Sequence, residues 1–120
     1  MSIPSFMLKK LYVKGSLKNT DDGFEFVLKN TLAPGSIIGI APGSIDDVVY
    51  PPESVTITTP KGTLRGDEIN SRNPVTLAMN LEAKVSVKGQ PLTPGEHHVV
   101  LSVLTREVGR IDIDLTDSVS

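Results

Sequence analysis

His97 and His98 are the only imidazole groups of the chain and therefore the first candidates for metal binding or acid–base chemistry. They are adjacent in the sequence. Because adjacent side chains of a strand point to opposite faces of a sheet, we do not expect the two rings to share one metal ion. We expect instead that one histidine caps the end of a sheet against a carbonyl group while the other is solvated.

Asp112 and Asp114 are the second candidates, because residues two apart in a strand share a face at about 7 Å. That separation suits a pair of carboxylates in acid–base work or a weakly bound divalent ion. A metal-dependent enzyme built on the histidines and these aspartates is therefore one hypothesis. Alternating charges on the outer face of an exposed hairpin are much commoner, so we predict no metal site and no cofactor.

The most polar and least periodic part of the chain, residues 63–73, is the best candidate for a binding loop. Loops on a rigid scaffold carry variable function, and this one contains Asp67, Glu68 and Arg72. A second polar segment, residues 42–50, is expected to lie in another loop. One hypothesis is therefore a module that binds a small ligand or a sugar through these two segments.

Catalysis by this chain alone is not expected. It has no cysteine, which excludes disulfides, thiolate metal sites and cysteine nucleophiles. The sequence contains neither a glycine-rich phosphate loop nor a nucleophile elbow, and its histidines have no carboxylate at a spacing diagnostic of a catalytic triad.

The strand expected over residues 97–105 is apolar on both sides. Val99, Leu101 and Val103 share one face, whereas Val100 and Leu104 lie on the other. Covering a second apolar face requires another sheet or another chain. We therefore predict that Val100 and Leu104 contribute to an interface, and that the protein self-associates or docks on a larger protein subunit.

The composition and net charge limit the class of protein and its partners. A chain of 120 residues with 38% hydrophobic and 22% charged residues is expected to fold as one domain, residues 1–120. The net charge of −2 gives no general attraction to nucleic acid or to a membrane surface. The first ten residues lack the apolar stretch of a signal peptide, so we expect a cytoplasmic protein.

Strands must position these residues. The chain has 13 Val, 9 Ile and 10 Thr but only 4 Ala, and β-branched residues favour strands. The 10 Gly and 9 Pro also interrupt the chain too often for helices of ordinary length. Alternation predicts strands over residues 10–18 and 24–28, a long strand over 75–87 with a bend near Asn80, and a final hairpin over 97–116. The pattern favours an all-β fold, an antiparallel two-sheet β-sandwich of immunoglobulin-like architecture with about seven to nine strands and no disulfide. A small barrel is the alternative closure.

Three stretches also resemble a known family: Gly-Ser-Leu-Lys-Asn at 15–19 leading to Gly-Phe-Glu-Phe at 23–26, Tyr-Pro-Pro-Glu-Ser-Val-Thr-Ile at 50–57, and Leu-Thr-Pro-Gly-Glu-His-His-Val-Val-Leu at 92–101. Their order and spacing resemble the small β subunit of C-glycoside deglycosidases. The resemblance implies a β-sandwich that associates with a larger, metal-dependent barrel subunit acting on carbohydrates. It assigns no functional residue in this chain. The expected function is thus a non-catalytic subunit or interaction module.

Overall fold

The computed structural model describes residues 4–119, so residues 1–3 and 120 of the expected domain lie outside the described residues. Strands dominate it. The elements are, in chain order, α1 (Ser5–Lys9), β1 (Lys18–Thr20), β2 (Gly23–Lys29), β3 (Gly35–Ile45), β4 (Val48–Tyr50), η1 (Pro52–Ser54), β5 (Val55–Thr59), β6 (Gly62–Arg65), η2 (Gly66–Glu68), β7 (Val75–Leu77), β8 (Glu82–Lys88), β9 (Gly95–Thr105) and β10 (Gly109–Val119). No helix within residues 4–119 has the length and apolar character needed to cross a membrane.

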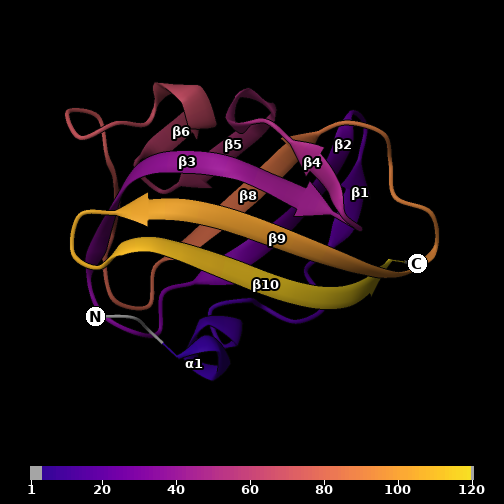
Figure 1. Ribbon diagram of the computed structural model, residues 1–120, viewed down its shortest axis with the longest axis horizontal. Coiled ribbons are helices and arrows are strands. Elements are labelled where there is room, and N and C mark those ends of the chain that lie inside the picture. Colours follow the sequence, from indigo (N-terminus) through magenta and orange to yellow (C-terminus); the bar gives the residue numbers. More distant parts are fainter. Residues whose placement is uncertain (1–3, 120) are drawn as a thin grey trace.

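The strands form two stacked antiparallel sheets (Figure 1). The first has the order β1-β2-β8-β5-β6, and the second has the order β10-β9-β3-β4 with β7 paired to β3. The predicted all-β sandwich is confirmed, with ten strands in place of the expected seven to nine.

Period-two alternation places the core between the sheets. Phe26 of β2, Val85 of β8 and Leu101 of β9 are each 0% exposed, and all three belong to one cluster of buried residues drawn from both sheets. Burying a side chain of this size contributes about 1.5–3 kcal/mol to the free energy of unfolding. The final hairpin is also confirmed, since β9 and β10 pair along their whole length.

The bend predicted near Asn80 marks a change of sheet. The chain leaves β7, which pairs with β3 in the second sheet, and enters β8 in the first. Asn80 lies between the two strands with φ of +66°, a backbone conformation that asparagine tolerates better than most residues. Its backbone N–H donates to the carbonyl of Asn30 at 2.6 Å, which holds the crossing in place.

The strand predicted over residues 10–18 is wrong. Residues 5–9 form the one-turn helix α1, Tyr12 makes only an isolated bridge to Leu28, and β1 begins at Lys18. A turn at Gly15, whose φ is +86°, interrupts the extended chain, because glycine adopts this conformation without a steric penalty.

Residues 12–15 are fastened to the last strand. The Tyr12 hydroxyl and the Gly15 backbone N–H both donate to Asp117 Oδ2 at 2.7 Å, and α1 lies alongside β10 (Figure 1). The N-terminal segment therefore covers part of β10, the edge strand of the second sheet.

Both expected binding loops also contain strand. Residues 42–45 complete β3, and a tight turn at Asp46 and Asp47 leads directly into β4. The pairing of β3 with β9 shifts register between Ala41 and Ser44, an irregularity of the kind at which a strand tolerates proline, here Pro42. Residues 63–65 belong to β6, a short polar edge strand whose sequence carries no alternation to reveal it.

Candidate functional site

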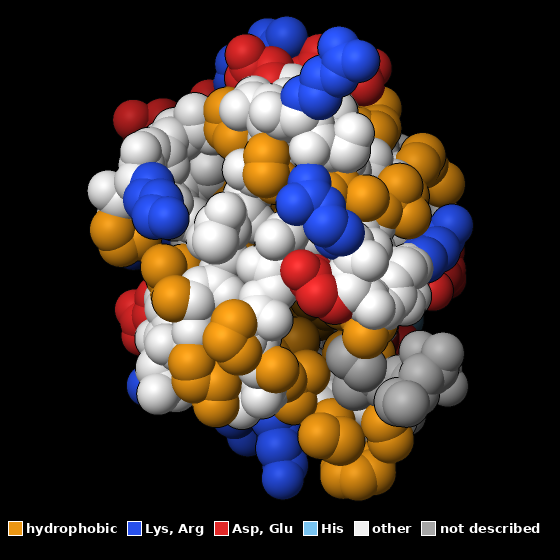
Figure 2. Space-filling model, turned by 90° about the vertical axis from the view of Figure 1, so that its left-hand side faces the viewer, with side chains coloured by type: hydrophobic (Ala, Val, Ile, Leu, Met, Phe, Trp, Pro, Cys, Tyr) orange, Lys and Arg blue, Asp and Glu red, His pale blue; other side chains and the backbone are white. Residues whose placement is uncertain are grey.

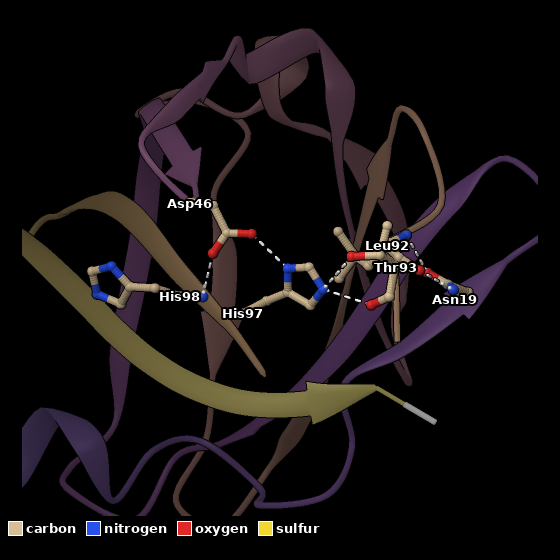
Figure 3. A network of polar contacts seen from close by, with 6 residues as sticks. All are labelled: Asn19, Asp46, Leu92, Thr93, His97 and His98. Carbon is tan, nitrogen blue, oxygen red and sulfur yellow. Dashed lines mark hydrogen bonds and ion pairs between the residues drawn. The ribbon is translucent and has the colours of Figure 1, made fainter. Parts of the chain in front are cut away.

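His97 lies at the start of β9 and points between the sheets (Figure 3). Its side chain is buried, with 9% exposed. Its Nδ1 is 2.5 Å from Asp46 Oδ2 and its Nε2 is 2.7 Å from the carbonyl oxygen of Thr93. The backbone N–H of His98 donates to the other oxygen of Asp46 at 2.8 Å. As predicted, one histidine caps the end of a sheet against a carbonyl group.

Both ring nitrogens of His97 therefore face hydrogen-bond acceptors. Only the imidazolium form donates from both nitrogens, so this geometry favours the charged ring. The hydrogen bond to Asp46 is the main cause that raises the pKa of His97 above its ordinary value. The backbone N–H of His98, followed by the His97 ring, lowers the pKa of Asp46. With both nitrogens engaged, the ring serves to hold structure and has no nitrogen left for a substrate.

The loop between β8 and β9 is fastened on both sides. Asn19 of β1 donates from Nδ2 to the Leu92 carbonyl at 2.9 Å and accepts from the Leu92 backbone N–H at 2.7 Å. His97 holds the next residue of the loop, Thr93. We call this end of the sandwich, defined by Asn19, Asp46, Leu92, Thr93 and His97, the closed end.

The other metal candidates lie outside. His98 is on the opposite face of β9 from His97, as predicted, and its Nε2 is 2.5 Å from Asp114 Oδ1. Asp112 does share a face with Asp114, but it accepts hydrogen bonds from Ser102 Oγ at 2.7 Å and Arg110 Nε at 3.1 Å. Among residues 4–119 no three His, Cys, Asp or Glu side chains are grouped to hold a metal ion.

The structure does not bring Asp67, Glu68 and Arg72 together as one site. Asp67 forms an ion pair with Arg65, and this contact lowers the pKa of the Asp67 carboxyl. Glu68 Oε1 accepts from the Arg65 backbone N–H at 2.9 Å, which caps η2. Arg72 is exposed in the following turn, beside Asn70, whose Oδ1 accepts from the Arg72 backbone N–H. Sugar binding by this segment stays a prediction.

Val100 and Leu104 lie on the outer face of the second sheet, alternating with the buried Val99, Leu101 and Val103. Ser44 is paired with both Val100 and Val49, so those three side chains share the outer face. We call Ala41, Val49, Val100 and Leu104 the outer patch.

Exposure of the outer patch is uneven. Val49 is 70% exposed and Leu104 39%, because Leu104 lies against Gly39, where a β carbon would be 3.1 Å from Leu104 Cδ1. Arg110, Asp112 and Asp114 of β10 line one side of the patch. Sequence analysis missed Val49, although the pair Val48-Val49 beside a turn was a visible signal.

The outer face of the first sheet is different in character. Its outward positions on β2 and β8 are mostly charged or hydroxyl-bearing: Glu25, Val27, Lys29, Glu82, Lys84, Ser86 and Lys88. The first sheet therefore presents mainly polar groups to solvent. The second sheet presents Val49, Val100 and Leu104, with the buried Ser102 between the last two.

The end of the sandwich opposite the closed end is open. A cavity of about 150 Å³ lies there between the sheets. Its deepest lining consists of almost inaccessible aliphatic side chains from both sheets: Ile57, Ala83, Val85, Leu101, Val103 and Ile113. Its accessible wall is formed by half-buried aliphatic side chains: Leu28, Leu32, Leu77, Leu81 and Ile111. Figure 2 faces this end and shows hydrophobic side chains gathered in the lower half of the view. We call it the open end. The cavity could not be predicted from the sequence, because its lining residues look like ordinary core residues.

The fold and these surfaces define an antiparallel β-sandwich module with a fastened end, an open end and one partly apolar outer face. A family model described as hydroxymethylglutaryl-CoA reductase, N-terminal domain, matches residues 7–120, and the chain belongs to this family. No curated protein matches the chain.

Proposed function

We propose that this protein is a non-catalytic β-sandwich module that docks, through the outer patch, on the catalytic part of a hydroxymethylglutaryl-CoA reductase. The family supplies the partner, since it is named for the N-terminal domain of that enzyme. The observation that carries the proposal is the set of outward-facing apolar side chains on the second sheet, of which Val49 and Leu104 are exposed and Val100 is half-buried.

The chemistry of the polar groups supports a non-catalytic role. His97 has both ring nitrogens engaged, and His98 is paired with Asp114 on the outer face. Asp67 and Glu68 are held by Arg65. These side chains bind one another, so their hydrogen bonds stabilise the module instead of serving a substrate.

A different partner follows from the resemblance to the β subunits of C-glycoside deglycosidases, which implies a large barrel subunit. Self-association through the same patch is the third arrangement. All three use a small sandwich as the docking module of a larger assembly, and they differ only in the occupant of the patch.

Sedimentation of the chain with the catalytic part of a reductase from the same genome tests the proposal. We expect a complex at tens of micromolar, and at least tenfold weaker binding after Leu104→Lys, because apolar residues at the centre of an interface carry much of the binding energy. Val27→Lys is the matched control: Val27 is a half-buried valine on the outer face of the first sheet, and its replacement should leave binding unchanged.

Two results would count against the proposal. One is a monomer that forms no complex with the reductase. The other is a complex weakened equally by the two variants. A complex formed instead with a barrel subunit, or with a second copy of the chain, would reassign the occupant of the patch.

A further inference from the structure

We infer that the cavity at the open end binds the alkyl end of a small amphiphilic molecule, with about six carbon atoms inside the sandwich and the polar head in solvent. This site is separate from the outer patch, so the inference stands or falls independently of the proposed docking. It rests on the size of the cavity, the chemistry of its wall and the state of the polar groups around it.

Size limits the occupant. Cavities of roughly 150 Å³ lined by aliphatic side chains stay dry and take up apolar molecules such as benzene or xenon. The cavity described here has a volume of about 150 Å³, and it opens to solvent at the end of the sandwich. A group of about six carbons fills such a space, and a longer chain would extend out of the opening.

The wall selects an apolar group. Its deepest residues, including Val85, Leu101 and Val103, are at most 2% exposed and carry no polar side-chain atom. A buried carboxylate or hydroxyl without a hydrogen-bond partner is strongly disfavoured. A hydroxymethylglutaryl group, which carries both, is therefore a poor occupant, and a plain alkyl or acyl chain is a good one.

Three polar side chains of the cavity lining, those of Asn30, Thr105 and Glu107, are engaged within the protein. Asn30 Nδ2 donates to the carbonyls of Ala33 at 2.8 Å and Leu77 at 3.1 Å. Glu107 Oε1 accepts from the Ser36 backbone N–H at 2.9 Å. Thr105 Oγ1 donates to the Gly109 carbonyl at 2.8 Å. These contacts shape the opening, and the aliphatic wall makes the alkyl group the main recognised part of the ligand.

A titration with straight-chain alcohols from butanol to octanol, followed by methyl NMR, tests the inference. We expect shifts at Leu101, Val103 and Ile113, which line the cavity, and little change at Val99 and Val119, which do not. Affinity should rise about fourfold per added methylene and then level off near six carbons. 3-Hydroxy-3-methylglutarate should cause no such shifts.

Paired variants locate the binding site. Val85→Ile combined with Val103→Ile adds two methyl groups to the cavity and should weaken hexanol binding about tenfold. Val99→Ile is the matched control, because Val99 is buried on the same face of β9 but does not line the cavity. The chain-length series needs only the unaltered protein, so it decides the matter even where a variant folds poorly.

The inference is overturned by any of three results: no methyl shifts up to the solubility limit of the alcohols, affinity that keeps rising through octanol, or equal hexanol affinity in the filled double variant and the control.

Discussion

At the closed end of the sandwich, one buried imidazole joins the β3–β4 turn to the loop before β9; at the open end, aliphatic side chains of both sheets surround a space of about 150 Å³. Hydrogen bonds therefore fix the geometry of the closed end, whereas the side chains at the open end are incompletely packed. The comparison thus sets a region held by polar contacts against a region whose side chains leave accessible space.

The largest effect is expected at the open end. Leu101→Ala enlarges the cavity and should lower the free energy of unfolding by about 3–5 kcal/mol, because the lost contacts and the extra void add together. Urea unfolding measures it. Leu104→Ala, on the same strand but partly exposed, should cost less than about 1 kcal/mol. Similar losses in the two variants would mean that the open end is not packed as described.

At the closed end, Asp46→Ala should cost about 1–2 kcal/mol, since it removes the acceptor for the His97 ring and for the His98 backbone N–H. Asp47→Ala is the control for backbone strain, because Asp46 and Asp47 both have positive φ, +49° and +69°. Thermal unfolding should show a larger loss of stability for Asp46→Ala than for Asp47→Ala. Equal losses would assign the effect to the turn conformation and not to the polar contacts.

The closed end should also make stability depend on pH. The pKa of His97 is raised above its ordinary 6.5, so its contribution is complete below about pH 6.5 and is lost as pH rises through the pKa of the folded state. The pKa of Asp46 is lowered below 3.8, so its contribution is complete above about pH 4 and is lost as pH falls further.

Asp46→Asn isolates this charge effect, because an amide keeps the shape and tolerates positive φ. In this variant the pKa of His97, followed by NMR titration, should fall, and the decline in stability on the alkaline side should flatten. An unchanged His97 titration would show that the Thr93 carbonyl alone holds the ring.

The smallest change in structure, one added methyl group, also distinguishes the two ends. Val103→Ile at the open end has space and should raise the free energy of unfolding by about 0.5–1 kcal/mol. Val99→Ile, closer to the closed end on the same strand, adds the same group to a filled core and should lower it by about 1–3 kcal/mol. Chemical unfolding of both variants compares them directly, and a change of the same sign in both would remove the distinction.

Much of the sandwich could be predicted because burial on one side imposes period two. That pattern was clear at Phe24 and Phe26, along residues 81–87, and at Ile111 to Leu115, and it also separated His97 from His98. Asn80 was recognisable as a bend because the expected strand was too long.

Other features depend on contacts between distant residues, which a local pattern does not encode. Helix α1 is a single turn, too short to be stable alone, and its Leu8 is buried in the common core. Residues 42–45 were expected in a loop, but pairing with β9 carries the strand through them across a register shift. Asp46 and His97 are 51 residues apart, and a cavity is a property of how side chains fail to fill space.

The attachment of Tyr12 and Gly15 to Asp117 joins the N-terminal segment to a strand that follows it by about a hundred residues, since Tyr12 and Asp117 are 105 residues apart. During synthesis these bonds form only after β10 has left the ribosome. Until then the long edge of β9 has no neighbour on that side, and an unpaired edge invites pairing with other chains. The nascent chain therefore needs shelter until β10 joins the sheet.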